Sequence, residues 1–229
     1  MEAFENSVYF GMTLSLAAYG LGMMLKSKFK LAILNPLLIS IIAVIAVLLI
    51  SGFDYDVYYE SAKYLSYLLT PATVCLAVPL YEKLDVLKKN IKAIMAGVLS
   101  GVLSSLGCIL LMSLVFGLSH EEYVTFLPKS ITTAIGMGVS EELGGYVTLT
   151  VGVIIITGVL GNMCAEFLLK LFRIEEPVAK GIAIGSASHA IGTAKALEIG
   201  EVEGAMSSLS LVISGLVTVV GASAFAQFI

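Results

Sequence analysis

The sequence predicts an all-α, polytopic integral membrane protein, and two observations lead to this prediction. First, 58% of the 229 residues are hydrophobic and only 13% are charged, whereas soluble domains are typically about 45–50% apolar and about 25% charged. Second, the apolar residues are gathered into segments of the length that a membrane-spanning helix needs, which is about 20 residues. The stretches between these segments are short loops, so residues 1–229 are predicted to form a single transmembrane domain.

The apolar segments are of two kinds. Five are predicted to cross the bilayer as full helices, and they cover residues 7–25, 31–52, 93–117, 147–170 and 204–228. Three more are long enough but contain helix-breaking residues. These are residues 64–82 with Pro71, residues 123–142 with Pro128, Gly136 and Gly138, and residues 181–199 with Gly185 and Gly192. The three are predicted to be interrupted or re-entrant elements, which some transporters with internal repeats also contain.

The distribution of lysine and arginine predicts how the chain is oriented. These residues are gathered at residues 26–30, 83–92 and 170–180, and cytoplasmic loops are enriched in them. The three loops are therefore predicted to face the inside of a bacterial-type plasma membrane, with the N-terminus outside. Residues 117–122 and 145–147 then both lie outside, so the chain between them must enter the membrane and return. Residues 181–199 either cross the membrane or re-enter it.

Polar residues in the interrupted segments are the candidate functional residues. A charge at the bilayer centre costs roughly 2.5–3.5 kcal/mol, and such residues usually face the protein interior or a pathway. The stretch LPKSITTAIGMG (127–138) supplies Lys129, Ser130, Thr132 and Thr133. A helix that starts within the membrane directs free N–H groups and its positive dipole end inward, which favours a carboxylate. The alternative is that Lys129 reaches the interface and the hydroxyls bond only helix carbonyls.

The stretch GSASHAIGTAK (185–195) supplies a second set of polar residues. They are Ser186, Ser188, His189, Thr193 and Lys195. The hypothesis is that the two interrupted elements, each with hydroxyls and one lysine, converge on one small organic anion. For His189 the alternative is a hydrogen bond between helices. For Lys195 it is an ion pair with Glu198 or Glu201, or a position at the interface.

The sequence contains none of the common catalytic motifs. GxSxG, HExxH, a Walker loop and a dinucleotide fingerprint are all absent. The three cysteines show no metal-ligand spacing, and there is no soluble domain to bind ATP. We therefore predict a protein that is not an enzyme and has no cofactor, no metal and no nucleic-acid partner. Any transport would be secondary or passive.

Four blocks of sequence resemble the LrgB/CidB family. They are LNPLL (34–38), LLTPATVCLAVPLYEKL (68–84), LPKSITTAIGMGVSEELGG (127–145) and GSASHAIGTAKALEIGEVEGAMSSLSL (185–211). That family includes bacterial antiholin-like membrane proteins and the C-terminal half of the plant plastid glycolate/glycerate translocator. Three positions depart from its usual pattern. Ala134 stands where members usually have proline, Ser186 stands in a block that often reads Gly-Thr-Ala-Ser-His, and Lys195 stands where members often have arginine. Lysine keeps the charge but lacks the planar guanidinium fork.

The resemblance implies two competing functions. One is export or uptake of small monocarboxylates such as pyruvate, glycolate or glycerate, bound at the interrupted helices. The other is an antiholin-like role that modulates murein hydrolase activity and cell lysis. Bacterial members are usually paired with a small membrane protein of the LrgA/CidA type. The expected partners are therefore a small organic anion, the lipid bilayer and such a small protein, and a homo-oligomer is left open.

Overall fold

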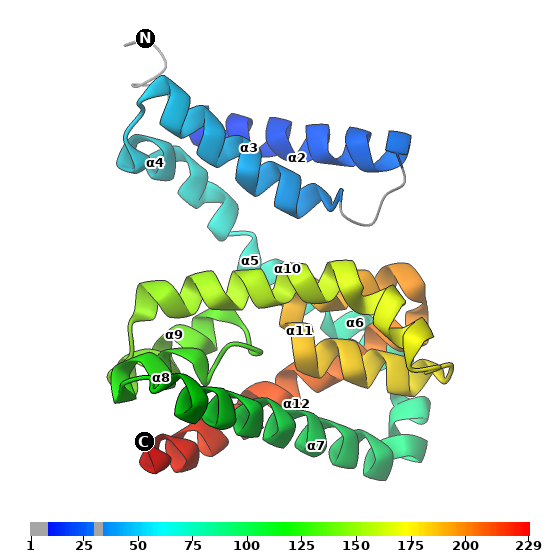
Figure 1. The fold of residues 1–229 in the computed structure, drawn as a ribbon. Coiled ribbons are helices and arrows are strands. Elements are labelled where there is room, and N and C mark those ends of the chain that lie inside the picture. The colour runs from blue at the N-terminus through cyan, green and yellow to red at the C-terminus, as the bar shows by residue number, and fades with distance from the viewer. Residues whose placement is uncertain (1–8, 30–33) are drawn as a thin grey trace. The chain divides into compact units, whose positions relative to one another are not determined.

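The computed structural model describes residues 9–29 and 34–229 of the chain. All regular secondary structure in these ranges is helical (Figure 1), as expected for an all-α membrane protein. The chain divides into two compact units, Met1–Cys75 and Leu76–Ile229. Each unit is described by itself.

The first unit is a small group of helices. It contains α2 (Phe10–Phe29), α3 (Pro36–Ser51), α4 (Tyr55–Ser66) and α5 (Leu69–Cys75). Asn35 fixes the start of α3, because its Oδ1 accepts hydrogen bonds from the N–H groups of Leu37 at 2.8 Å and Leu38 at 3.3 Å. Helix α2 packs against α3 and α4, and the Gly11 N–H donates to Ser61 Oγ at 2.6 Å.

Two of the predicted spans are shorter or less apolar than expected. The segments 7–25 and 31–52 correspond to α2 and α3, and neither is among the described helices that are long and apolar enough to cross a membrane. Helix α3 has 16 residues, because its cap at Asn35 delays its start. Residues 7–8 and 31–33 of these segments lie outside the described residues.

Pro71 does not interrupt a helix as predicted. It is the third residue of α5, within the first turn. A helix tolerates proline there, because the N–H groups of the first turn have no partner within the helix. The interruptions in segment 64–82 lie on either side of α5, between it and α4 and before α6 (Ala77–Glu82).

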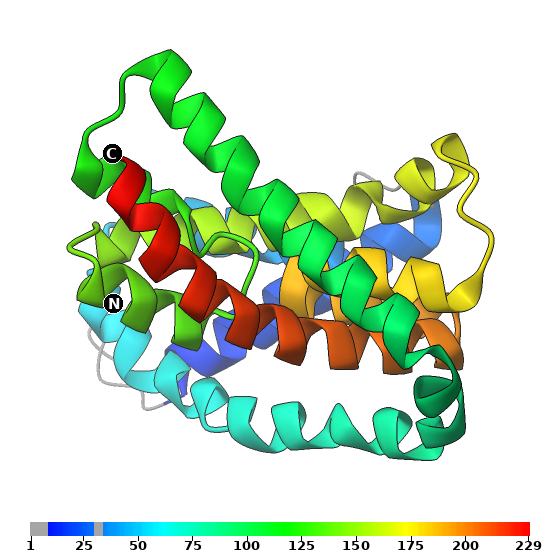
Figure 2. The same cartoon turned by 90° about the horizontal axis from the view of Figure 1, so that it is seen from below.

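The second unit holds the remaining helices. They are α6, α7 (Leu84–Phe116), α8 (His120–Phe126), α9 (Thr133–Glu142), α10 (Val147–Leu171), α11 (Pro177–Ile199), α12 (Glu201–Phe225) and the 3-10 helix η1 (Ala226–Phe228). Three described helices are long and apolar enough to cross a membrane: α7, α10, and α12 with η1. They correspond to the predicted spans 93–117, 147–170 and 204–228. Figure 2 shows α7 and α12 running along the length of this unit.

The second unit has two ends of different composition. At one end, Lys83 and Lys180 face the first turn of α12: Lys83 Nζ lies 2.8 Å from Glu201 Oε2, and Lys180 Nζ lies 4.0 Å from Glu203 Oε1. We call it the lysine-rich end, because it carries the lysines of residues 83–92 and 170–180.

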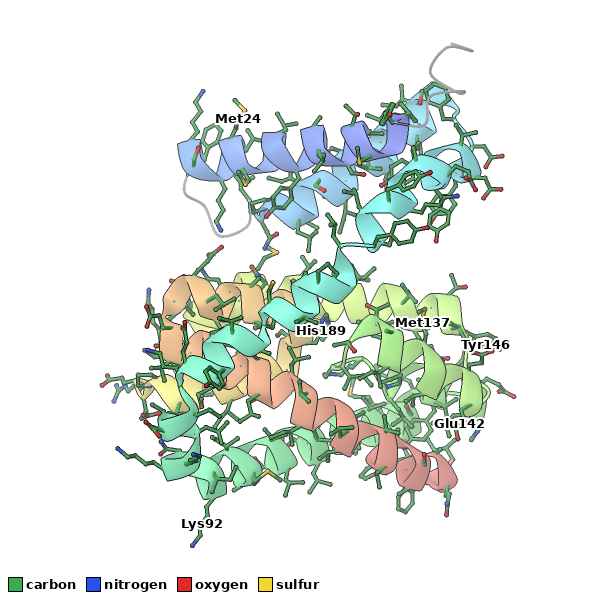
Figure 3. The ribbon with its side chains drawn as sticks, turned by 180° about the vertical axis from the view of Figure 1, so that it is seen from behind. Met24, Lys92, Met137, Glu142, Tyr146 and His189 are labelled. Carbon is green, nitrogen blue, oxygen red and sulfur yellow. The ribbon has the colours of Figure 1, made fainter. Side chains whose placement is uncertain are left out.

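The opposite end is formed by residues 117–122, 142–147 and 226–229, which contain no lysine or arginine. We call it the lysine-free end. His120 Nδ1 lies 2.8 Å from Ile229 O there, so the described chain ends beside α8. Figure 3 shows Lys92 toward one end of the unit, Glu142 and Tyr146 at the other, and His189 between them.

A stripe of apolar residues on α7 forms much of the core. Ile94, Val98, Val102 and Leu106 repeat every four residues and are buried, as expected for one face of a helix. This face packs on α11 and α12. Gly97 and Gly101 of α7 contact Ile182 and Ser186 of α11, respectively. The GxxxG pair is therefore used for packing inside the chain.

Candidate functional site

Residues 120–142 enter the second unit from the lysine-free end and return to it; we call them the first hairpin. Helix α8 leads inward and α9 leads back, with residues 127–132 between them as the tip. Three buried hydroxyl groups connect the base of this hairpin to the start of α10. Thr125 Oγ1 accepts a hydrogen bond from the Tyr146 N–H at 2.8 Å. Thr150 Oγ1 lies 3.0 Å from Thr125 O and 2.7 Å from Ser140 Oγ.

The tip of the first hairpin carries the predicted lysine and lies deep in the unit. Lys129 Nζ donates to Ser130 Oγ at 3.0 Å, and Ser130 Oγ lies 3.4 Å from Ser105 Oγ of α7. Ser105 is about 17 Å before the end of α7, at about 1.5 Å per residue. Lys129 is partly buried. Within the described part of the chain it forms no ion pair with a carboxylate.

The start of α9 continues the tip. Thr132 is the N-cap residue of α9, but its side chain makes no capping hydrogen bond, and Thr133 is the first helical residue. Pro128 lies in the non-helical tip. The predicted break at Gly136 and Gly138 is wrong, because both glycines lie inside α9.

Packing explains one of these two helical glycines. Gly136 lets α9 approach α10 so closely that a β-carbon would overlap the Ile154 side chain, whereas Gly138 faces open space. A glycine inside a helix costs about 1 kcal/mol relative to alanine. Tertiary contacts offset this cost, so α9 stays continuous.

Helix α11 is a second hairpin, which enters from the lysine-rich end. It begins and ends there, because Lys180 near its start and Ile199 at its end line the same cavity. The helix is interrupted at His189, which has φ 42° and ψ −142°, and its two parts run in different directions (Figure 1). Residues 181–199 therefore return to the end of the unit at which they started.

Contacts with α12 show the same reversal. In the first part of α11, Gly181 contacts Met206 and Gly185 contacts Ser207, so this part runs parallel to α12. In the second part the order is reversed. Thr193 Oγ1 lies 2.9 Å from Ser207 Oγ, and Leu197 contacts Gly204.

The glycines predicted to interrupt α11 are helical, which corrects that prediction. Gly185 lies against the backbone of Ser207, and Gly192 lies against Ser188 and Ile184. Both serve close packing of the hairpin. The interruption falls instead on His189, a residue with a side chain, at a positive φ that is uncommon for any residue except glycine.

Three hydrogen bonds stabilise the strained tip of the second hairpin. His189 Nε2 lies 3.0 Å from Ile154 O of α10. Asn162 Nδ2 donates to Ile191 O at 2.8 Å, and Thr193 Oγ1 donates to His189 O at 3.0 Å. Such backbone strain costs on the order of 1–3 kcal/mol and persists only where the surroundings hold it.

Lys195 is paired with carboxylates. Its Nζ lies 2.6 Å from Glu166 Oε1 and 3.1 Å from Glu198 Oε2, so the pairing with Glu198 that the sequence left open is present. Lys195 follows the tip toward the lysine-rich end, whereas Lys129 lies at the tip of the other hairpin. The structure therefore gives the two lysines different surroundings.

The two predicted serines of the second hairpin also make contacts between or within helices. Ser186 Oγ donates to Ile182 O at 2.7 Å, and the Ser188 side chain lies against Gly161 of α10. Together with His189 and Thr193, they connect the second hairpin to its neighbours.

The two tips reach a similar depth from opposite ends. On α10, Ile154 contacts both hairpins, because its side chain packs on Gly136 and its carbonyl meets His189. On α7, Gly101 contacts Ser186 and Ser105 lies near Ser130, about one helical turn apart. His189 is about 18 Å from the start of α11, roughly half of a hydrocarbon core of about 30 Å.

Comparison with known proteins gives the family. A family model described as LrgB-like matches residues 15–228. The chain belongs to the LrgB-like family. The holin-like protein CidB of Staphylococcus aureus (strain Mu50 / ATCC 700699) is 41% identical over 205 residues, 90% of each chain. The antiholin-like protein LrgB of Bacillus subtilis (strain 168) is 37% identical over 224 residues, 97% of each chain. No solved structure matches the chain.

Several residues that build the site in this LrgB-like protein were not predicted from the sequence. The hydroxyls that join the first hairpin to α10 come from Thr125, Ser140 and Thr150, which lie far apart in the sequence. Ser105 of α7 was also missed, because it looks like any small residue in an apolar helix. Glu166 carried a signal, since it is a carboxylate inside an apolar span, but its partner Lys195 could not be assigned from spacing.

Proposed function

We propose that the protein is a holin-like or antiholin-like membrane protein that takes part in the control of cell lysis. The similarity to CidB and LrgB, which covers 90% or more of the chain, supports this proposal. In this role it modulates murein hydrolase activity in the plasma membrane, together with a small partner of the LrgA/CidA type. The lysine-rich end faces the cytoplasm and the N-terminus lies outside, following the distribution of positive charge.

A second candidate function is a secondary carrier or facilitator for small monocarboxylates. The observation that favours it is the pair of hairpins from opposite ends. In secondary transporters, interrupted helices near the bilayer midplane often form the substrate site, and non-helical backbone at this depth survives where protein surrounds it or water reaches it.

In this second proposal, the first hairpin binds the anion. Lys129 attracts the carboxylate, since a buried charge needs a partner. Ser130, Thr132 and Thr133 bind it through their hydroxyls, and the free N–H groups at the start of α9 favour negative charge. His189 orients the site from the second hairpin or carries a coupled proton. No enzymatic step is involved.

One set of variants tests both proposals. A strain without the gene is complemented with the wild type, Lys129→Gln or Lys129→Arg, and its autolysis rate is measured. The same proteins are reconstituted in proteoliposomes, with and without the small partner, for uptake of labelled pyruvate and glycolate. The carrier proposal predicts that Lys129→Gln lowers uptake about tenfold or more, because the buried cation is lost, and that Lys129→Arg keeps part of it.

The outcomes separate the two functions. Absence of wild-type uptake under both conditions contradicts the carrier. An autolysis rate that is the same with and without the wild-type gene contradicts the role in lysis. If Lys129→Gln abolishes uptake and leaves autolysis control intact, the two activities are independent. If it abolishes both, transport is the basis of the effect on lysis.

A further inference from the structure

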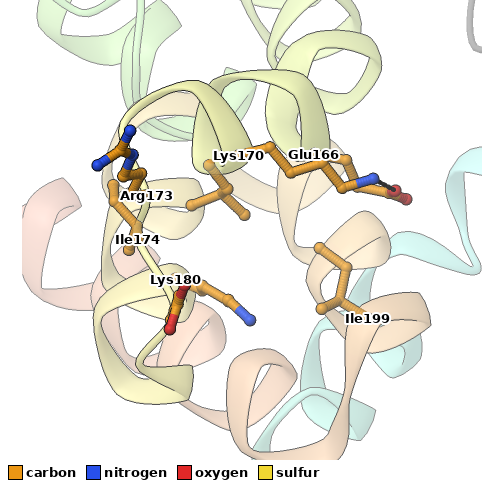
Figure 4. Close-up of a pocket in the computed structure, with 8 residues that line it drawn as sticks. Glu166, Lys170, Arg173, Ile174, Lys180 and Ile199 are labelled. Atoms are coloured by element: carbon orange, nitrogen blue, oxygen red, sulfur yellow. Dashed lines mark ion pairs between the residues drawn. The ribbon is translucent and has the colours of Figure 1, made fainter.

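A cavity of about 490 Å³ lies at the mouth of the second hairpin. It is bounded by the end of α10, the turn after it, and the first and last turns of α11. Its lining consists of Glu166, Leu169, Lys170, Arg173, Ile174, Glu175, Lys180 and Ile199. Figure 4 shows the Lys180 amine directed toward the middle of this ring of side chains. The cavity thus combines cations with an apolar wall.

Glu166 on the cavity wall lies between two lysines. Its Oε1 is 2.6 Å from Lys195 Nζ. Its Oε2 is 3.9 Å from Lys170 Nζ, and Figure 4 shows this second pair. The Lys195 side chain is 17% exposed and the Lys170 side chain 82% exposed. Glu166 therefore pairs closely with the more buried cation and loosely with the one in solvent.

We propose that this cavity is a binding site for a small carboxylate, and that Glu166 on its wall pairs with Lys195, which is not itself a lining residue, until the solute displaces Glu166 and takes over that ion pair. The proposal rests on the carrier form of the proposed function and adds a second site to it, at the lysine-rich end. In the empty protein the Glu166 carboxylate stands in for the solute. When a solute carboxylate enters, Glu166 moves to Lys170.

The exchange keeps every charge paired. A partly buried lysine that loses a carboxylate partner is destabilised, and Glu166 is the nearer of the two partners of Lys195, with Glu198 at 3.1 Å. Glu198 stays beside Lys195 in both states, and the second carboxylate comes either from Glu166 or from the solute. Lys170 is already within ion-pair distance of Glu166, so the displaced carboxylate keeps a partner.

The shape of the cavity suits a short organic acid. Ligand pockets of about 300–1,000 Å³ hold drug-sized molecules, so a two- to four-carbon acid fits with room for water. Leu169, Ile174 and Ile199 offer apolar contacts to its carbon chain. An inorganic anion would gain nothing from that wall, which favours a carboxylate with a short apolar part.

The test compares two glutamates that line the same cavity. Glu166→Gln and Glu175→Gln remove the same charge from it, but the ion pairs found for Lys195 involve Glu166 and Glu198. The full chain is placed in lipid nanodiscs, and calorimetry measures binding of pyruvate, with neutral pyruvamide as the uncharged probe. We expect Glu166→Gln to lower the Kd for pyruvate about tenfold, since the internal competitor is gone, and Glu175→Gln to lower it less than about threefold.

Two more variants sharpen the result. Adding Lys195→Gln to Glu166→Gln should abolish the tighter pyruvate binding of the single variant. Lys170→Gln alone should weaken pyruvate binding, because it removes the second partner of Glu166. Equal effects of Glu166→Gln and Glu175→Gln overturn the proposal, since they indicate only a change in net charge. The proposal is also overturned if Glu166→Gln lowers the Kd for pyruvamide as much as the Kd for pyruvate, or if the Glu166→Gln protein does not bind pyruvate. Wild-type uptake into proteoliposomes together with any of these results leaves the carrier standing and removes only this site.

Discussion

At the residue scale, buried hydroxyl groups hold the first hairpin to α10. Thr150 has no exposed surface, and its Oγ1 is within 3.0 Å of both Thr125 O and Ser140 Oγ. In an apolar environment a polar group that loses its partner is expensive. These contacts, rather than charged groups, connect the base of the first hairpin to α10.

We therefore expect Thr150→Val to destabilise the protein by about 1–2 kcal/mol, because it leaves the Thr125 carbonyl and the Ser140 hydroxyl with fewer partners. Thermal unfolding in detergent measures the change. Thr148→Val is the matched control, since Thr148 lies on the same helix and is exposed. Equal unfolding temperatures for the two variants would contradict a role of the buried hydroxyl.

At the element scale, glycines let the second hairpin approach α10. Gly158 contacts the His189 ring, and Gly161 lies against the Ser188 side chain. Small residues at helix contacts are typical of membrane proteins, where close packing replaces much of the hydrophobic driving force. The tip of the hairpin depends on this fit, because His189 must reach the carbonyl of Ile154.

Gly161→Ala should destabilise the protein by about 1–3 kcal/mol, since the added methyl overlaps Ser188. Gly152→Ala in the same helix should be neutral or stabilise it by up to about 1 kcal/mol, because open space surrounds Gly152 and alanine favours a helix over glycine. Unfolding temperatures of the two variants provide the measurement. A stable Gly161→Ala protein would show that the hairpin does not need this close contact.

At the scale of the second unit, two hairpins enter from opposite ends between three long helices. Each hairpin follows a long helix, α7 before the first and α10 before the second, and these two helices run in opposite directions. This relation resembles an inverted repeat of the kind that many transporters contain.

Cysteine labelling from the two sides of a membrane tests this topology. In a background with Cys75, Cys108 and Cys164 replaced by serine, Glu175→Cys and Glu201→Cys should be labelled from the same side, and Glu122→Cys from the other. A helix α11 that crossed the membrane would place residues 175 and 201 on opposite sides. The loss of the exposed Lys83–Glu201 ion pair should matter little.

The sequence by itself determined the class, the family and the position of the long spans in the second unit. Long apolar segments and clustered lysines are local patterns, and the predicted return of residues 123–142 follows from charge placement alone. The sequence also marked Lys129 and His189 as unusual, because polar groups at membrane depth are costly wherever the neighbours lie.

Only the tertiary structure decided how those residues are used. It moved the interruption of α11 from two glycines to His189, because glycine permits a break but packing against Ser207 and Ile184 keeps both glycines helical. It also pairs Lys195 with Glu166, which lies 29 positions earlier in the sequence. The chain direction of α11 depends on contacts with α10 and α12. Such contacts join distant positions, and no local pattern in the sequence specifies them.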